Sequence, residues 1–507
     1  MTMMESFLQA LTVALTPYAI GAVGFGTLVG LVFGSIPGLT FTVALALALP
    51  ITFSMESVPA IGLLLGTYIG GMTGGSVSAI LLGIPGTPSA AATVLDGRPM
   101  TKNGKASIAL GTAVIVSVFG GIFSLIVMIV SVDLVSRVAI GFGPAEIFAL
   151  VLFGFSTICG LCGRSIVKGL ISGLLGLMIM TIGLDEIEGI PRLTFGSINM
   201  LQGVNLLVAM IGLFAVPFII EAFSERAETH GRPGPAVNVR AELPSIGLLV
   251  KNAWLMIRCS VIGTGIGAIP GTGGPIAAFL AYDHARRFSK KPQTFGKGNI
   301  EGVIAPETAN NAVTGGTLIP LLSLGIPGDP ATAIVLAGLM IHGIVPGPAL
   351  FMNHATEVYG MYVAVVIAYF WVLALQLFGI RIFIHVLKVP RDMLAVVVMV
   401  LGAIGAYSIR NSAFDIYSMA VIGVAAYVLI AIRVPVTPII LGMVLGPTLE
   451  NEFRTAMMLS EGKMDIFFTS PTVVVFFSLA ALVIILQGVS ELKLKRKIKD
   501  EVKASDA

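Results

Sequence analysis

"LGIPGTPSAAATVL" at residues 82–95 and "LGIPGDPATAIVL" at residues 324–336 are almost the same phrase, written far apart in one chain. Each places Pro-Gly and a second proline inside an apolar run. Proline removes a backbone donor and clashes with the preceding helical turn, while glycine permits a sharp reversal. Each phrase therefore predicts a helix that breaks and restarts.

The composition shows where such helices must lie. The chain has 507 residues, of which 56% are hydrophobic and only 11% are charged, whereas about a quarter of the residues in soluble domains are charged. This excludes a soluble globular protein and predicts an all-α polytopic membrane protein. Spans of about 20 residues predict about 12 transmembrane segments, including broken helices and re-entrant hairpins. The first run, at residues 10–33, follows no basic region and no cleavage site, so we expect a retained helix rather than a signal peptide.

Self-similarity extends beyond the opening phrase. "GLVFGSIPGLT" at residues 30–40 has a partner in "GTGIGAIPGTG" at residues 263–273, and "TGGS" at residues 73–76 has a partner in "TGGT" at residues 314–317. The motifs follow in the same order in both halves of the chain, which predicts a duplicated unit. The predicted parts are a first transmembrane half at residues 1–224, a cytoplasmic or interfacial linker at 225–250, a second half at 251–489 and a basic tail at 490–507.

Charge in the connecting segments indicates how the halves face. "DGRPMTKNGK" follows the first phrase and is basic, whereas "GLMIHGIVPGP" after the second phrase contains no Lys or Arg. In the second half "RRFSKK" follows the IPGTGG break, whereas its first-half counterpart "TFSMESVP" has no cation. Under the positive-inside rule the two copies face opposite ways, which predicts an inverted-topology repeat of the kind found in secondary transporters. The tail "KLKRKIK" predicts a cytoplasmic C-terminus, and we expect this basic run to anchor the topology rather than to bind nucleic acid.

A broken helix inside the membrane must be buried in protein or line a watery cavity. The N-terminus of a half-helix carries about half a positive charge and several free N–H groups. The four Pro-Gly breaks would together supply about two positive charges if they converged, which predicts a site for an anion. Hydroxyl residues follow each break: Thr40, Thr87, Thr272 and Thr332.

The most polar apolar-flanked stretch is "EGVIAPETANNAVTGGTLIPLL" at residues 301–322. Asn310 and Asn311 are candidates to bind substrate carboxylates through amide N–H groups, or cations through carbonyl oxygens. Glu307 is a candidate cation or proton carrier if it lies at membrane depth, where a charge usually has a role; a wet loop is the alternative. Asp329 is predicted to be a cation ligand or a helix N-cap, and Thr332 is a further cation-coupling candidate. No cofactor is expected, and no metal beyond a coupled Na⁺; H⁺ is the other candidate ion.

Two other classes of protein share single features with this sequence. An intramembrane aspartic protease would need a Tyr-Asp pair, as at Tyr282 and Asp283, and a Gly-x-Gly-Asp motif, in which Ile326 here replaces the first glycine. No zinc-protease, P-loop or Gly-x-Ser-x-Gly motif is present, so we expect a chain that is not an enzyme. A gated anion channel is the stronger alternative to a carrier, since glycine-rich re-entrant hairpins also build pores.

Several long motifs resemble one family. "YIGGMTGGSVSAILLGIPGTPSAAATVLDGRPM", "IPGTGG", "APETANNAVTGGTLIPLLSLGIPG" and "PVTPIILGMVLGPTLE" resemble the large membrane subunit, the TctA-type permease, of tripartite tricarboxylate transporters, over about residues 24–471. The resemblance implies a multi-pass protein of the bacterial cytoplasmic (inner) membrane that works with a small four-helix membrane subunit and a periplasmic solute-binding protein. It implies import by symport of carboxylates such as citrate, or of di- or aromatic carboxylates, driven by a sodium or proton gradient and by alternating access.

The positions that match the motifs of this family complete the set of predicted substrate-binding residues. Asp329 stands where a small or amide residue is expected. The predicted set is Gly38, Thr40, Gly75, Ser76, Gly86, Thr87, Gly271, Thr272, Gly273, Asn310, Asn311, Thr314 and Gly328.

Overall fold

The computed structural model describes residues 3–37, 39–161, 165–185, 187–224, 241–386 and 389–505. The chain forms two compact units: unit 1 is Met1–Ala139 with Phe214–Ala413, and unit 2 is Ile140–Leu213 with Phe414–Ala507. Each unit combines residues from both predicted halves of the sequence. The division into halves at residues 1–224 and 251–489 stays a prediction.

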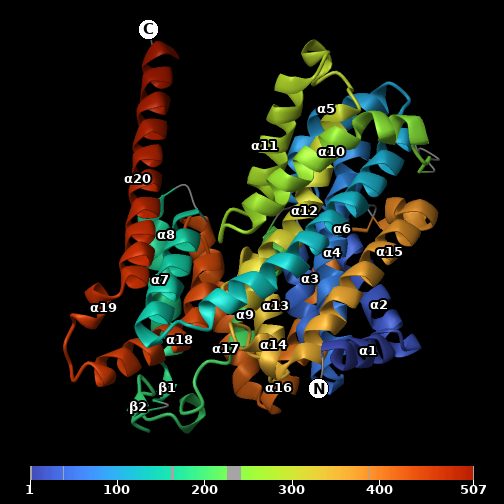
Figure 1. The fold of residues 1–507 in the computed structure, drawn as a ribbon. Coiled ribbons are helices and arrows are strands. Elements are labelled where there is room, and N and C mark those ends of the chain that lie inside the picture. The colour runs from blue at the N-terminus through green and yellow to red at the C-terminus, as the bar shows by residue number, and fades with distance from the viewer. Residues whose placement is uncertain are drawn as a thin grey trace. The chain divides into compact units, whose positions relative to one another are not determined.

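Unit 1 holds the helices that carry the repeated motifs (Figure 1). From the first half they are α1 (Met3–Ala14), α2 (Pro17–Ser35), α3 (Phe41–Ala48), η1 (Leu49–Ser54), α4 (Ser57–Leu81), η2 (Pro88–Ala90), α5 (Ala91–Lys102) and α6 (Ala106–Ala139). From the second half they are α10 (Ile246–Gly267), α11 (Gly273–Phe288), η4 (Pro292–Thr294), α12 (Glu301–Leu324), α13 (Pro330–Ile341), α14 (Leu350–Asn353), α15 (Ala355–Val386) and α16 (Arg391–Arg410). The order of long and short helices is the same around the breaks of both halves.

Unit 2 is built from α7 (Pro144–Leu161), α8 (Ile166–Met180), η3 (Ile198–Met200), α18 (Thr437–Leu459), α19 (Ile466–Thr469), α20 (Pro471–Ser505) and nearly all of α17 (Ala413–Ala431). Helix α9 (Leu206–Ser224) begins in unit 2 and ends in unit 1. An antiparallel pair of short strands, β1 (Gly183–Leu184) and β2 (Pro191–Arg192), follows α8, with Gly183 opposite Arg192.

The all-α membrane class is confirmed, and two details of the prediction were wrong. Nine helices of the described residues are long and apolar enough to cross a membrane; the number of about 12 segments stays a prediction. The first apolar run is not one helix over 10–33, because the chain breaks where the Thr16 side chain accepts a hydrogen bond from Ala19 N and Pro17 starts a new helix. The basic segment after the first phrase is not a loop but forms most of α5.

Glycines let the helices of unit 1 approach at backbone distance. A Cβ on Gly30 of α2 would lie 2.1 Å from Thr67 O of α4, and a Cβ on Gly263 of α10 would lie 2.2 Å from Ala309 O of α12. Gly30 and Gly263 occupy the same place in the repeated motif that precedes Ile-Pro-Gly. The motif therefore serves the close helix contacts that small residues allow in membrane bundles, as well as the break that follows it.

Helices α4 and α12 pair in antiparallel order. Tyr68 shares a hydrogen bond with Thr317, whereas Thr73, later in α4, bonds Asn311, earlier in α12. Since both helices carry the Thr-Gly-Gly motif, equivalent helices of the two halves run in opposite directions where they touch. An inverted repeat requires this relation.

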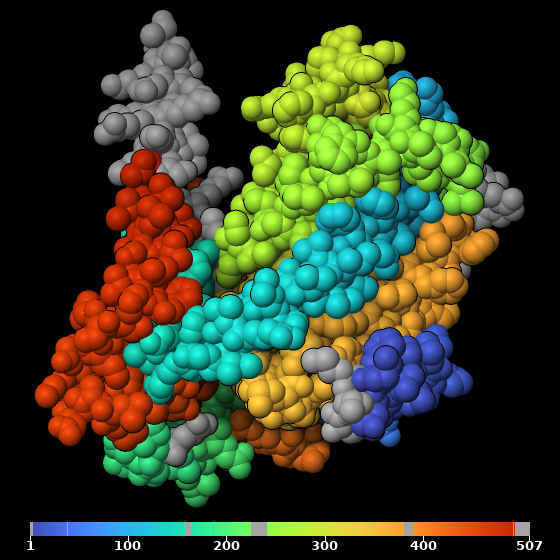
Figure 2. Space-filling model, viewed as in Figure 1, coloured from blue at the N-terminus to red at the C-terminus, as the bar shows by residue number. Residues whose placement is uncertain are grey.

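Helix α6 closes one side of this pair. Figure 2 shows it as a cyan band between the yellow-green of α10 and the orange of α15. A Cβ on Gly120 would lie 2.2 Å from Thr308 O of α12, and a Cβ on Gly121 would overlap the ring of Tyr369 of α15. The polar side chains between α4, α6 and α12 are therefore sealed on the α6 side.

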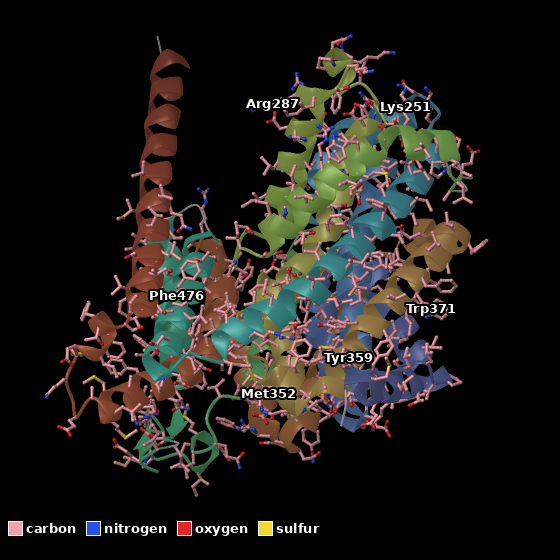
Figure 3. The ribbon with its side chains drawn as sticks, viewed as in Figure 1. Lys251, Arg287, Met352, Tyr359, Trp371 and Phe476 are labelled. Atoms are coloured by element: carbon pink, nitrogen blue, oxygen red, sulfur yellow. The ribbon has the colours of Figure 1, made fainter. Side chains whose placement is uncertain are left out.

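Basic residues of α10 and α11 lie at the same end of unit 1. Lys251 of α10 and Arg287 of α11 lie at one end of the unit, and Met352 and Tyr359 lie at the other (Figure 3). The end of α5 joins the cationic side, because Asn103 Nδ2 donates to Lys297 O over 3.4 Å. The basic segments of the two halves, which stand at non-equivalent places in the repeat, thus meet at the same end.

A buried aspartate holds this end together. Asp96 of α5 is 0% exposed, and its carboxylate accepts hydrogen bonds from Tyr282 Oη and from the backbone N–H groups of Gly296, Gly298 and Asn299. Tyr282 is therefore paired with Asp96, on a different helix from the neighbouring Asp283 of the protease motif. Asp96 is a structural fastener between α5 and the segment that leads into α12.

Candidate functional site

The helix breaks of unit 1 meet one another. Gly271 N, at the break before α11, donates a hydrogen bond of 2.7 Å to Gly328 O, at the break before α13. A Cβ built on Gly274, in the first turn of α11, would lie 2.6 Å from Ser89 Oγ of η2 and 2.6 Å from Asn310 Oδ1 of α12. The start of α11 therefore contacts two other breaks. One is the break before α13, in the second half, and the other is the break before η2, in the first half.

The two repeated phrases cap their own helices. Asp329 Oδ1 accepts from Thr332 N over 2.7 Å and from Thr332 Oγ1 over 2.9 Å, while Thr332 Oγ1 also accepts from Asp329 N over 2.9 Å. Thr87, at the equivalent place in the first phrase, accepts from Ala90 N over 3.4 Å. Of the two predicted roles for Asp329, the structure has the helix N-cap, and Thr332 completes the capping box.

The other two half-helices have no side-chain cap. Thr40, before α3, instead shares a hydrogen bond of 2.6 Å with Thr42. Thr272, before α11, donates its hydroxyl backwards to the carbonyls of Ile266 and Ile269. Two of the four expected helix N-termini, those that follow the repeated phrases, are thus capped by Thr87 and Asp329. The N-termini of α3 and α11 have no side-chain cap.

Glycine is required at the start of α11. Gly271 has φ +82° and Gly273 has φ +64°, in the left-handed region that other residues adopt at a cost. Gly274 lacks the Cβ that would collide with Ser89 and Asn310. The sequence "GTGG" is therefore needed for the turn and for the close approach of the two oxygens.

Asn310 and Asn311 differ in their surroundings. Asn311 uses both ends of its amide: Oδ1 accepts from Thr73 Oγ1 over 2.8 Å, and Nδ2 donates to Ser117 Oγ over 2.8 Å and to Glu307 O over 3.1 Å. Asn310 Nδ2 donates to Met72 O over 3.0 Å, but Asn310 Oδ1 is buried without a hydrogen-bond partner. Asn311 ties three helices together, and Asn310 presents an unused acceptor.

Glu307 lies in α12, and the alternative of a wet loop was wrong. Its side chain is 1% exposed. Oε1 accepts from Thr93 Oγ1 of α5 over 2.5 Å, and Oε2 accepts from Ser117 Oγ of α6 over 3.4 Å. None of the ion pairs among the described side chains includes Glu307. A buried carboxylate is thus held by hydroxyl groups.

Tyrosines form a second polar layer that sequence reasoning missed. Tyr68 Oη donates to Asp329 Oδ2 over 2.8 Å and shares a hydrogen bond with Thr317 over 2.9 Å. Tyr369 Oη shares a hydrogen bond of 2.7 Å with Thr314 and donates to Asn311 O over 3.2 Å. Tyr68 stands close to the Thr-Gly-Gly motif in the sequence, and this proximity could have identified it as part of the polar site. Tyr369 lies in the apolar helix α15, where no neighbouring motif indicates its role.

The remaining predicted residues serve local packing. A Cβ on Gly75 would lie 2.3 Å from Thr87 Oγ1, one on Gly86 2.1 Å from Gly34 O, and one on Gly328 2.7 Å from the Cβ of Thr317. Ser76 donates to Thr73 O over 2.8 Å. Gly38 lies outside the described residues. Within those residues no group of three or more His, Cys, Asp or Glu side chains is placed to hold a metal ion.

These features define a multi-pass helical membrane protein with a buried polar site at the junction of broken helices. The chain belongs to the tripartite tricarboxylate transporter TctA family, whose model matches residues 20–441. The resemblance read from the motifs is thereby confirmed. This is a family of transporter components that function with the other parts of a tripartite system, in agreement with a chain that is not an enzyme.

Two relatives come from Agrobacterium vitis. One, described as an uncharacterized 52.8 kDa protein in the TAR-I ttuC' 3'region, is 34% identical over 469 residues, which is 90% of this chain and 91% of the relative. The other, an uncharacterized protein in the TAR-II ttuC' 3'region, is 36% identical over 234 residues, which is 46% of this chain and 97% of the relative. No solved structure matches the chain.

Proposed function

We propose that this chain is the permease subunit of an ion-gradient-driven importer of carboxylate anions, such as citrate or related di- and aromatic carboxylates. The observation that carries the proposal is the junction at Gly274, where an uncapped helix N-terminus meets an unpartnered amide oxygen of α12, the helix that also carries the buried Glu307. The junction joins residues of both halves, as alternating access about a midplane site requires.

The N-termini of α3 and α11 supply the attraction for the anion. An uncapped N-terminus offers free N–H groups and about half a positive charge, and it does so without a lysine that would hold the substrate too tightly for release. The caps at Thr87 and Asp329 remove the other two N-termini from this role. Gly273 and Gly274 on one side and Thr40 on the other are the proposed first contacts, since Gly271 N already donates to Gly328 O.

Glu307 is the proposed coupling residue. An isolated carboxylate at membrane depth costs at least about 2.5 kcal/mol, and hydroxyl donors from Thr93 and Ser117 compensate only part of its charge. A proton or a sodium ion bound here neutralises the side chain, so occupancy of Glu307 by the ion favours the state in which it is sealed. The cap role of Asp329 leaves Glu307 as the stronger of the two carboxylate candidates.

Energetics require such coupling. Moving one charge through 100 mV is worth about 2.3 kcal/mol, so importing a trianion against an inside-negative potential costs about 7 kcal/mol. A tenfold concentration adds about 1.4 kcal/mol. Co-transport of three cations cancels the electrical part, and more than three drive accumulation.

The proposed setting is the bacterial cytoplasmic membrane, with the C-terminus in the cytoplasm. The proposed partners are a small four-helix membrane subunit and a periplasmic solute-binding protein that delivers the anion. The basic segments after the two breaks lie at the end of unit 1 that holds Lys251 and Arg287, which supports a cytoplasmic placement of that end.

Uptake by proteoliposomes tests the proposal. The chain is reconstituted with its small subunit, the binding protein is added outside, and labelled citrate, succinate and benzoate are offered with and without an imposed sodium or proton gradient. We expect at least one carboxylate to accumulate above its equilibrium level only when a gradient is present. Equilibration independent of any gradient would instead identify a gated anion channel.

A further inference from the structure

We infer that Asn310 Oδ1 is a subsite for a hydroxyl group of the substrate, so that the permease prefers carboxylates that carry a hydroxyl next to the carboxylate. This inference rests on the proposed function and names the class of anion that fits it. The juxtaposition that carries it is a buried, unpartnered acceptor beside the uncapped N-terminus of α11.

The orientation of the Asn310 amide is fixed by its other end. Nδ2 donates to Met72 O over 3.0 Å, and a flipped amide would place two carbonyl oxygens against each other. Oδ1 must therefore face away from the Met72 carbonyl oxygen, towards Gly274. The side chain is 1% exposed, and a buried acceptor without a donor is rare in native proteins.

The neighbouring asparagine shows that the side-chain type and the helix do not by themselves leave an acceptor unpartnered. Asn311 has the same side chain on the same helix, and every polar atom of its amide is used within the protein. Ser89 Oγ, the other oxygen that a Cβ on Gly274 would meet, does not donate to Asn310 Oδ1, since that oxygen has no partner among the described residues. The amide oxygen of Asn310 is thus a free acceptor beside the start of α11.

The surroundings decide between a cation and a hydroxyl donor. The start of α11 has positive partial charge, which opposes a bare cation at Asn310. The nearby carboxylates are engaged elsewhere, Glu307 with Thr93 and Ser117 and Asp329 with its cap and Tyr68. An anion whose carboxylate meets the N–H groups of α11, and whose adjacent hydroxyl donates to Oδ1, satisfies both features at once.

Matched pairs of anions test the inference. Citrate is compared with tricarballylate, which lacks only the hydroxyl, and malate is compared with succinate. The measured quantity is kcat/KM for uptake by the complete system, for the wild-type chain and for Asn310→Ala, with the same binding protein throughout. Because the partner is unchanged, any change in the ratio between the members of a pair comes from the permease.

We expect the wild-type chain to prefer the hydroxylated member by about tenfold or more, as a site built around a polar group rejects an analogue that leaves it unpaired. In Asn310→Ala the ratio should fall towards the value set by the binding protein alone, chiefly through loss of the hydroxylated substrate. An unchanged ratio in the variant, or no preference in the wild type, overturns the subsite while uptake itself stands. Absence of uptake for all four anions in the wild type would instead overturn the proposed function.

A second measurement does not depend on transport by the variant. Ligand-induced thermal stabilisation of the purified wild-type permease is recorded with the same four anions. The hydroxylated members should stabilise the chain at about tenfold lower concentration than their analogues. Equal stabilisation by both members of each pair contradicts the inference even if Asn310→Ala fails to fold.

Discussion

Thr93 Oγ1 donates a hydrogen bond of 2.5 Å to Glu307 Oε1, joining α5 of the first half to α12 of the second. Ser117 and Asn311 extend the connection to α6, and Thr73 extends it to α4. A carboxylate that binds or releases an ion here alters hydrogen bonds on helices from both halves. Such a position suits a coupling residue, because one local event biases several packed elements.

Replacing Glu307 by Gln should abolish coupling while keeping the fold. Gln has nearly the same shape and still accepts from Thr93, but it carries no charge for an ion to neutralise. We expect the substrate no longer to accumulate above its equilibrium level when a gradient is imposed, with an elution profile like that of the wild type. Glu301→Gln, at the half-buried start of the same helix, is the matched control and should accumulate normally. Full accumulation by Glu307→Gln would show that another group couples substrate uptake to the ion gradient.

Asp329 should matter for stability through its cap. Asp329→Ala removes the bonds to Thr332 and the acceptor for Tyr68, and loss of a cap and a buried partner costs about 1–3 kcal/mol. Asp329→Thr introduces the residue type that stands at the equivalent place in the first phrase, Thr87. This variant should lose less stability than Asp329→Ala. Thermal unfolding in nanodiscs measures the order wild type, Thr, Ala; an alanine variant as stable as the wild type would contradict the role.

The glycine contacts between α2 and α4 predict a sharp positional effect. Gly30→Ala puts a Cβ 2.1 Å from Thr67 O, whereas around Gly21 on the same helix nothing lies within 4 Å. We expect Gly30→Ala to destabilise the chain by about 1–3 kcal/mol or more and Gly21→Ala to be neutral or slightly stabilising. Melting temperatures of the two variants give the comparison, and equal values would refute the close approach of the helices.

The strand pair of unit 2 should loosen in acid. The backbone N–H of Ile187 donates to Asp185 Oδ1 over 2.8 Å, and Arg454 and Arg192 lie 3.0 and 3.3 Å from Oδ2. These bonds, that from Ile187 foremost, hold the pKa of Asp185 below its ordinary value. The stabilisation is present above the unfolded pKa of about 3.9 and is lost as the pH falls through the lower folded value.

Hydrogen exchange of residues 183–192, corrected for intrinsic rates, checks this between pH 5 and 2.5. Protection should fall over that range in the wild type, and Asp185→Asn should have low protection that varies little. Glu188→Gln, whose carboxylate is 4.0 Å from Arg454 and largely exposed, should behave as the wild type does. A pH profile that Asp185→Asn leaves unchanged would assign the transition to another group.

The sequence predicted the breaks and the helices around them, because proline and glycine act locally and apolar runs have the length of a membrane span. It also pointed to Glu307, Asn310 and Asn311, since polar residues are conspicuous in such a run. The sequence did not predict that two of the four N-termini are capped and two are not. For α11 this difference depends on whether the Thr272 hydroxyl points towards the following helix or back to the preceding one.

The hydrogen-bond partners of Glu307, Asn311 and Thr314 could not be predicted from the sequence either. Thr93, Ser117 and Tyr369 stand in segments far from α12 in the chain, and threonine, serine and tyrosine are common in helices without any site. In the sequence, Asp96 is part of a basic segment with no indicated role. Only the fold shows that its carboxylate accepts hydrogen bonds from three backbone N–H groups and from Tyr282. Contacts between the halves decide such roles, and spacing along one half carries no information about them.

The central claim is that the substrate binds where the broken helices of the two halves meet. Hydrogen–deuterium exchange of the permease in nanodiscs, with and without saturating citrate or the best carboxylate of the uptake panel, tests this most directly. We expect added protection concentrated at the start of α11 around Gly273 and Gly274, at η2 around Ser89, and at Asn310. Protection confined to unit 2, with these segments unchanged, would place the site elsewhere and contradict the account.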